Sequence, residues 1–280
     1  MSSTTLVIRP PQRRISLELR SLWEHRGLVY FFVWRDIKVR YKQSIFGVGW
    51  AIIQPLFMMA AFTLFFGRLA GISADGIPRP IFYYAAILPW GYFSNAVTHA
   101  SNSVIAGQAV FTKVYFPRLV LPLSSVLSGL LDLAIAFVML MGMVAFYAFR
   151  GTPGVDVSPV IALLPLFIIL AVATALGTGL WLSALHARYR DVRYIVGFLT
   201  QFWMFASPVA YPSSIVPERW RALYGLNPMA GVIDGFRWSL TGQGRPPGPL
   251  LAASTAAVLL LLWGGLWYFR SREGTMADIV

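Results

Sequence analysis

Six long apolar stretches dominate this sequence and constrain its fold more than any other feature. They are separated by shorter segments that hold most of the charged residues. An α-helix needs about 20 predominantly apolar residues to cross a bilayer, and most of the stretches reach that length. The sequence therefore predicts an all-α integral membrane protein with six transmembrane helices, at residues 47–69, 81–105, 119–149, 160–185, 194–211 and 250–269.

Two of these stretches depart from a simple straight span. The third is too long for one perpendicular helix, so we expect it to tilt or to extend past the hydrocarbon. The fifth is short, and Ser207, Pro208 and Pro212 interrupt its end. Broken helices are tolerated at membrane depth only against protein or a water-filled cavity. We therefore expect the fifth stretch to break, with short re-entrant helices before the last span.

The composition excludes a soluble globular protein. Charged residues make up 12% of the chain and apolar residues 57%, whereas a soluble domain has about 25% charged residues. The absence of cysteine excludes disulfides, cysteine-ligated zinc and thiol nucleophiles. Residues 1–12 lack the apolar core of a signal peptide, so we expect the first span to direct the chain to the membrane.

Basic residues near the span ends predict the orientation, because they are retained in the cytoplasm. Both termini are predicted to be cytosolic, and the net charge of +12 is interpreted as topology and contact with anionic lipid rather than nucleic-acid binding. Nine cations precede the first span: Arg9, Arg13, Arg14, Arg20, Arg26, Arg35, Lys38, Arg40 and Lys42. Four other cations lie in the loop that this orientation makes external, which opposes the orientation unless the loop folds back into the membrane surface. They are Arg219, Arg221, Arg237 and Arg245.

This topology divides the chain into a cytosolic segment at 1–45, a six-helix transmembrane domain at 46–270 and a cytosolic tail at 271–280. The domain would have cytosolic loops at 106–118 and 186–193 and an external region at 207–249. Apolar and charged residues alternate before the first span, as in an amphipathic helix at the interface. Such a helix is either a lipid anchor or a lever that contacts a cytosolic partner. Its charged residues include Arg35, Asp36, Arg40 and Lys42.

The polar residues offer little catalytic chemistry. No phosphate-binding loop of the form Gly-x-x-x-x-Gly-Lys-[Ser/Thr] occurs, so another subunit would have to hydrolyse any ATP. The three histidines, His25, His99 and His186, are dispersed and do not predict a metal site. Asp132 is the only carboxylate well inside an apolar stretch, where a charge costs at least about 3 kcal/mol. It either makes a structural hydrogen bond or has a lining or coupling role.

Several short motifs together indicate a family. In their order and spacing they resemble the membrane subunit of type-2 ABC exporters for bacterial surface polysaccharides, and the resemblance covers nearly the whole chain. The motifs are Trp34-Arg35-Asp36 through Gln54-Pro55, Phe111 to Pro117 before Leu121-Pro122, Arg188-Tyr189-Arg190-Asp191, Leu226-Asn227-Pro228-Met229 and Gly235-Phe236-Arg237.

The resemblance implies a transport subunit that is not itself an enzyme. It implies a homodimer around a central channel, driven by two copies of a separate cytosolic ATPase that would bind ATP and magnesium. No cofactor would be bound by this chain. The substrate would be a lipid-linked polysaccharide, such as O-antigen, capsule or teichoic acid, moved from the cytosolic to the outer face of the bacterial inner membrane.

The resemblance also implies roles for individual residues. The first cytosolic loop would dock into the ATPase through a coupling segment at 108–117, with a second contact in the loop at 186–193. The coupling residues would be Gln108, Thr112, Lys113, Tyr115, Phe116, Pro117, Arg188, Arg190 and Asp191. Re-entrant helices would gate the outer mouth, with Pro208, Pro212, Asn227 and Pro228 at their bends.

Aromatic rings would suit a polymer path, because they stack on sugar C–H surfaces without fixing one register. Most aromatic residues near the span ends are expected to form the interfacial belt. On the broken fifth stretch, the channel candidates are Phe202, Trp203 and Tyr211. Two alternatives remain at this point, namely an ABC exporter of lipid or a small hydrophobic drug, and a membrane glycosyl- or acyltransferase. The transferase would need clustered carboxylates or histidines on one membrane face.

Overall fold

The computed structural model describes residues 19–42, 45–111, 116–155, 159–243 and 248–274. Within these ranges every regular element is helical and no strand occurs, which confirms the all-α prediction for this part of the chain. Residues 1–18 of the predicted N-terminal segment and 275–280 of the predicted tail lie outside the described residues, as does Arg245.

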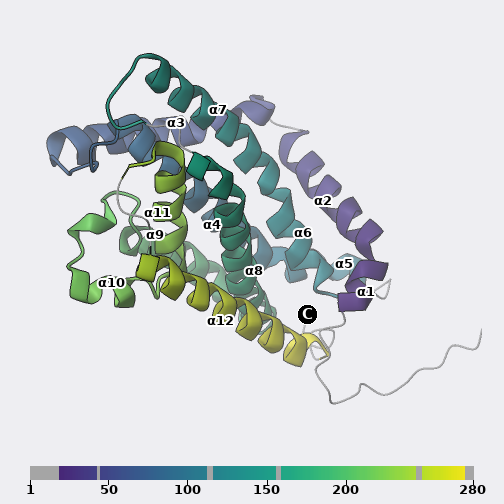
Figure 1. The fold of residues 1–280 in the computed structure, drawn as a ribbon. Helices are drawn as coiled ribbons and strands as arrows, with labels where there is room; N and C mark the ends of the chain where they lie inside the picture. Colours follow the sequence, from purple (N-terminus) through teal and green to yellow (C-terminus); the bar gives the residue numbers. More distant parts are fainter. Residues whose placement is uncertain (1–18, 43–44, 112–115, 156–158, 244–247, 275–280) are drawn as a thin grey trace, which may run out of the picture.

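Two helices precede the first apolar stretch and lie along one side of the molecule (Figure 1). They are α1 (Leu19–Glu24) and α2 (Arg26–Tyr41), drawn in purple. The α2 helix packs on α6 (Val120–Ser128), because Phe32 is buried against Phe116, Val120 and Leu121. A helix therefore precedes the first apolar stretch, and one face of it is covered by protein.

The first apolar stretch is one long helix with three local geometries. It begins as a 3₁₀ turn, η1 (Gly47–Gly49), continues as α3 (Trp50–Phe62) and ends as a π-helical segment, η2 (Thr63–Leu69). Much of its surface is apolar and exposed, with 73% of Phe57 accessible. A lipid environment or a second subunit would cover such a face, because a monomeric soluble protein rarely exposes a large apolar patch.

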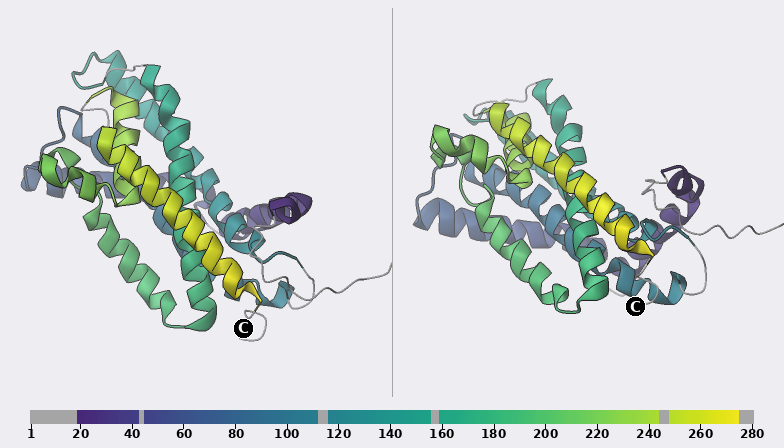
Figure 2. Two further views of the ribbon diagram at one scale, coloured as in Figure 1. Left: turned by 60° about the horizontal axis from the view of Figure 1, so that its bottom comes forward. Right: turned by 90° about the horizontal axis from the view of Figure 1, so that it is seen from below.

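The centre of the molecule is α4 (Arg79–Ala106), which is followed by the short α5 (Gln108–Phe111). Figures 1 and 2 show α4 surrounded by the other long helices. Two of its tyrosines bond to neighbouring main chain: Tyr84 donates to the Ala136 carbonyl at 3.3 Å and Tyr92 to the Val126 carbonyl at 3.2 Å. These bonds satisfy buried hydroxyl groups that would otherwise be costly.

The third apolar stretch is divided into α6 and α7 (Leu130–Phe149) at Gly129. A side chain at Gly129 would crowd Tyr92, because its Cβ would lie 3.3 Å from the ring. Gly129 keeps right-handed helical backbone angles, and Val120–Phe149 still counts as one apolar helix of 30 residues, longer than a perpendicular span needs.

The α8 and α12 helices pack closely against each other. The η3 turn (Pro159–Leu163) leads into α8 (Leu164–Arg188), and α12 (Gly248–Glu273) packs along it. A Cβ on Gly177 would lie 2.8 Å from the Leu262 nitrogen, and a Cβ on Gly265 would lie 2.4 Å from the Gly177 oxygen. Small residues at this crossing let the two backbones meet, as is common between membrane helices.

The chain reverses direction after α9 (Val192–Ala206). It forms η4 (Ser213–Ile215), α10 (Glu218–Tyr224) and α11 (Pro228–Thr241). The α11 helix packs against α4, α8 and α12, as Figure 1 shows. It starts with Asn227 as its N-cap and Pro228 in the first turn, and it ends at Gly242, whose φ is +64°. These are the residue types that begin and end helices.

Four helices are long and apolar enough to cross a membrane among the residues that the structure describes. They are Gly47–Leu69, Val120–Phe149, Pro159–Arg188 and Gly248–Glu273. The second and fifth predicted spans correspond to α4 and α9 and are not among the four. The α4 helix has many polar and aromatic residues, and α9 has 15 residues, fewer than a straight span needs.

Candidate functional site

A groove of about 610 Å³ lies between α3, α4, α7 and α9. Its accessible polar side chains include three amides from different helices, Gln54 of α3, Asn95 of α4 and Gln201 of α9, together with His99 of α4. Aromatic rings of Trp50, Trp90 and Tyr92 also line it. The groove therefore presents hydrogen-bonding groups and flat apolar surfaces in a region made of long apolar helices.

Asp132 of α7 lines one part of this groove and is paired with residues that come before the first span. The Arg40 guanidinium donates to one carboxylate oxygen, and the Tyr41 hydroxyl donates to the other. About a quarter of each charged side chain is accessible, 24% for Arg40 and 27% for Asp132. The ion pair and the second hydrogen bond offset the desolvation of a carboxylate at this position. Sequence reasoning assigned these residues to separate roles and did not pair them.

The three channel candidates occupy different environments. Phe202 is 63% exposed and stacks on Phe198, with ring centroids 6.3 Å apart. Trp203 is half-buried, packs on Phe93 at 5.1 Å and donates to the Asn227 side-chain oxygen at 2.8 Å. The Tyr211 and Tyr224 hydroxyl groups are 3.1 Å apart. Only Phe202 of these three therefore offers an open ring face in the monomer.

Asn227 joins the start of α11 to the end of α9. Its side-chain oxygen accepts from the Met229 amide at 3.1 Å as well as from Trp203. Its side-chain nitrogen donates to the Ala206 carbonyl at 3.0 Å and to the Ser207 hydroxyl at 2.9 Å. All four bonding positions of the amide are used, so Asn227 fixes the fold-back. The predicted bend residues Pro208, Pro212 and Pro228 are buried around this region.

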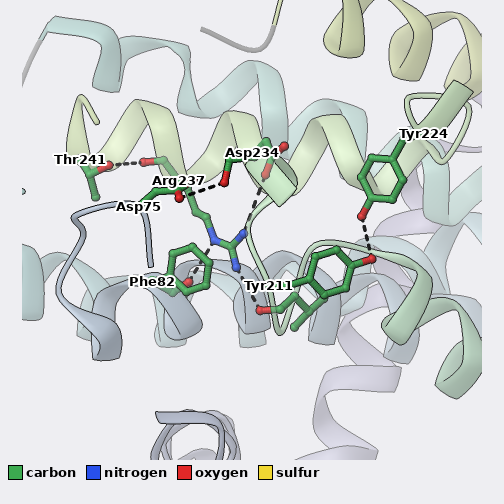
Figure 3. Close-up of polar contacts among 9 residues, drawn as sticks. Asp75, Phe82, Tyr211, Tyr224, Asp234, Arg237 and Thr241 are labelled. Carbon is green, nitrogen blue, oxygen red and sulfur yellow. Dashed lines mark hydrogen bonds and ion pairs between the residues drawn. The ribbon is translucent and has the colours of Figure 1, made fainter. Parts of the chain in front are cut away.

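Arg237 is a buried cation that the sequence analysis treated as a topology signal and as part of a family motif, without predicting its burial. In Figure 3 its guanidinium extends from α11 toward Phe82 at the start of α4. It donates to the Phe82 carbonyl at 3.1 Å and to the Val209 carbonyl at 3.0 Å, and it lies 3.7 Å from the centre of the Phe82 ring. Asp234 lies 3.8 Å away as its counter-ion. The apolar neighbours of Arg237 in the sequence were the available signal of burial.

The electrostatics of this pair follow from burial. Burial lowers the pKa of Arg237 to about 10, which still leaves the guanidinium charged near neutral pH. Burial raises the pKa of Asp234, while the positive charge of Arg237 opposes that change. Arg237 therefore acts as a charged connector of α11, α4 and the chain after α9.

Only some of the predicted coupling residues lie within the described ranges. Thr112, Lys113 and Tyr115 lie outside the described residues. Gln108 is half-buried on α5, and Pro117 is buried. Phe116 is 5% exposed, with its ring centroid 5.7 Å from that of Phe32 on α2. Its ring therefore faces α2 instead of an open surface.

The residues of the second predicted ATPase contact, and the charged residues in and just after α2, are more accessible than Phe116. Arg188, Arg190 and Asp191 are all exposed at the turn between α8 and α9. On α2, Arg35 and Asp36 form an ion pair at 2.8 Å, and Arg35 also lies 4.6 Å from the Phe32 ring centre. Lys42, directly after α2, is exposed.

The residues that the structure describes hold no group of three or more histidine, aspartate or glutamate side chains that could bind a metal ion. His186, one of the dispersed histidines, lies 3.1 Å from the Ser101 carbonyl and joins α8 to α4. Ligand sites commonly form between the helices of a bundle, where a few polar groups converge among apolar and aromatic residues.

Comparison with known proteins identifies the family. The sequence profile of the ABC-2 type transporter family matches residues 27–241, and the chain belongs to that family. The resemblance inferred from the motifs is thereby confirmed at the level of the family.

Three named relatives are similar over most of their length. The O-antigen export system permease protein RfbA of Myxococcus xanthus is 31% identical over 265 residues, which cover 94% of this chain and 98% of the relative. A protein of the same name from Klebsiella pneumoniae is 28% identical over 72% of this chain and 76% of its own length. The polysialic acid transport protein KpsM of Escherichia coli is 20% identical over 86% of this chain and 92% of its own length.

Proposed function

We propose that this chain is the permease subunit of an ATP-driven exporter that moves a lipid-linked polysaccharide from the cytosolic to the outer face of the bacterial inner membrane. The family is one of transporters, and the named relatives are permease and transport proteins for O-antigen and polysialic acid. These names favour polysaccharide over a lipid or drug substrate, and they favour transport over the transferase alternative.

The observation that carries this proposal is the groove between α3, α4, α7 and α9. A sugar polymer presents hydroxyl groups in all directions and C–H faces between them. The amides of Gln54, Asn95 and Gln201 can both donate and accept hydrogen bonds, and Trp50 can stack on a C–H face. Such contacts suit a substrate that must move past them.

The proposed topology has six spans, with α4 and α9 added to the four apolar helices. The α4 helix has 28 residues, enough to cross a bilayer. Its polar residues are acceptable there because other helices surround it. The α9 helix would cross together with the chain that follows it, and α10 and α11 would re-enter and gate the outer mouth. Both termini would then be cytosolic, and α2 would lie at the cytosolic interface.

The transport path would be completed by a second copy of the chain. The helices α3 and α9 border the groove and have exposed aromatic residues, including Phe57 and Phe202. In a homodimer, two such grooves would face each other and enclose a channel. Phe202 would line it directly, whereas Trp203 and Tyr211 would position the gate.

Two copies of a separate ATPase would bind ATP and magnesium and drive the cycle. The exposed residues Arg188, Arg190 and Asp191 would contact this partner, together with the segment at 108–117. Phe116 would act through its contact with Phe32, which joins that segment to α2. Arg40 would continue the connection from α2 to Asp132.

Depletion of the protein in cells tests the proposed function directly. Total lipid-linked polysaccharide and its surface-accessible fraction would be measured side by side. Intact polymer should accumulate on the cytosolic side, and complementation with the wild-type chain should restore surface display. Normal surface display in depleted cells, without a redundant exporter, would instead favour export of a lipid or a small hydrophobic drug.

A matched pair of variants tests the groove. Asn95 lines it, whereas Asn102 is exposed farther along α4 and does not. Asn95→Leu should reduce surface polysaccharide several-fold, because it removes a hydrogen-bonding side chain from the path. Asn102→Leu should leave export unchanged. Equal export by both variants would remove this groove from the transport path.

A further inference from the structure

The end of the last helix and the start of α6 are joined by two reciprocal hydrogen bonds. The main-chain amide of Arg118 donates to a carboxylate oxygen of Glu273 at 2.8 Å. The guanidinium of Arg118 donates to the main-chain oxygen of the same glutamate. Each side chain therefore bonds to the main chain of the other residue, although 155 positions separate them in the sequence.

A third residue completes this cluster. The second carboxylate oxygen of Glu273 accepts from Arg270 at 2.8 Å. The side chains of Arg270 and Glu273 are 9% and 18% exposed, so the pair is largely shielded from water. Hydrogen bonds to ionised groups are stronger and more directional than neutral ones. We call Arg118, Arg270 and Glu273 the α12 clamp.

Apolar contacts hold the same short stretch of chain from two sides. On the α12 side, Leu119 belongs to a buried cluster with Phe269. On the α2 side, Phe116 packs against Phe32. The residues at 116–119 thus lie between the end of α12 and the helix before the first span. They are also the point where the first predicted cytosolic loop rejoins the helices.

We propose that Glu273 is a positioning residue for coupling between the ATPase and the transport path. The proposal rests on the proposed function, because it assumes that the loop before α6 receives a displacement from the ATPase. Arg118 precedes α6, and Glu273 is the last residue of α12. The clamp makes these two helix ends move together. Without it, the start of α6 could be displaced while α12 stays in place.

Hydrogen–deuterium exchange of the full chain tests whether the clamp holds this junction. Residues 116–121 should exchange about tenfold faster in Glu273→Ala than in the wild type, because the Arg118 amide loses a charged acceptor. Glu273→Gln keeps an acceptor oxygen and should restore most of the protection. Ser271→Ala is the matched control, since that hydroxyl bonds only within α12, to the Tyr268 carbonyl. Unchanged exchange at 116–121 in Glu273→Ala would overturn the proposal.

Transport measurements on the chain assembled with its ATPase in vesicles test the coupling role. The number of glycans exported per ATP hydrolysed should fall several-fold in Glu273→Ala, recover in Glu273→Gln and stay unchanged in Ser271→Ala. Midpoints of thermal unfolding, measured in parallel, would reveal a general loss of stability. An unaltered ratio in Glu273→Ala would overturn the coupling role.

The two proposals fail in different ways. If the wild-type assembly exports no polysaccharide, the proposed function is refuted. The exchange experiment needs no substrate, so it tests the clamp in either case. If Glu273→Ala does not fold, the comparison of Glu273→Gln with the wild type replaces it, with a smaller expected increase in exchange at 116–121.

Discussion

Arg40, just before the end of α2, donates to the carboxylate of Asp132 in the first turn of α7, 92 positions farther along the chain. Tyr41 bonds to the same carboxylate, so two consecutive residues connect α2 to an apolar helix. A carboxylate in this position would be costly alone, and the pairing offsets that cost. The pair also borders the groove between α3, α4, α7 and α9.

The Arg40–Asp132 pair predicts coupled losses of stability. Asp132→Asn keeps an acceptor for Tyr41 but loses the ion pair, so it should lower the free energy of unfolding by about 1–3 kcal/mol. Arg40→Gln should cost a similar amount, and the double variant should cost less than the sum of the two. Lys42→Gln is the control, since this exposed cation should contribute less than about 0.5 kcal/mol. Chemical unfolding in detergent measures all four variants, and strictly additive losses would contradict the pairing.

Phe202 and Trp203 are neighbours in sequence but should respond differently to truncation. Phe202→Ala should leave the unfolding midpoint nearly unchanged and reduce polysaccharide export, because its ring is exposed. Trp203→Phe should lower stability by about 1 kcal/mol, because Asn227 loses a donor. Thermal unfolding and surface display of glycan, measured together, separate the two effects. Loss of export in both variants without any change in stability would show that Trp203 also acts in the path.

Arg237 should tolerate neither an apolar nor a basic replacement. Arg237→Met leaves Asp234 buried without its counter-ion and should cost about 3–5 kcal/mol. Arg237→Lys keeps the charge but lacks the planar fork that reaches both the Phe82 and Val209 carbonyls, so it should also be less stable. Arg219→Met changes an exposed arginine on α10 and should lie within about 0.5 kcal/mol of the wild type. Wild-type stability of Arg237→Met would refute the connector role.

The close approach of α8 and α12 predicts opposite effects of two alanine substitutions. Gly177→Ala would place a Cβ 2.8 Å from the Leu262 nitrogen and should cost about 1–3 kcal/mol, because backbone atoms must separate. Gly142→Ala, on α7, meets nothing within 4 Å and should stabilise its helix by about 0.5–1 kcal/mol. Chemical unfolding of both variants provides the measurement. A neutral Gly177→Ala would show that the two helices separate easily.

The helical elements were largely predictable, because apolar length is a local property. The stretches at 160–185 and 250–269 correspond to α8 and α12, although each helix ends a few residues later than predicted. The interruption at Ser207 and Pro208 does end α9. Less predictable was the interruption of the third stretch at Gly129, where a side chain would crowd the Tyr92 ring of a different helix.

The sequence pointed to single residues of the candidate site but not to the contacts between them. Motifs and intramembrane charge drew attention to Arg40, Asp132, Trp203 and Asn227 as separate signals. Their pairing as Arg40 with Asp132 and Trp203 with Asn227 appears only when the helices are packed. Gln54 was noted only as part of a family motif, and Asn95 and Gln201 were not singled out, because a single amide in an apolar stretch has no pattern of its own.

The sequence by itself determined the class of this protein, its helical character and its family. The length and composition of apolar stretches and the order of short motifs can be read directly from the amino-acid sequence, without knowledge of the packing. Only the tertiary structure decided which polar groups meet: Asp132 with Arg40, Arg237 with the Phe82 carbonyl and Glu273 with Arg118. The physical reason is that long-range pairing is settled by packing. Inside apolar surroundings each charge must find a partner, and the partner is whichever group the neighbouring helix brings within reach.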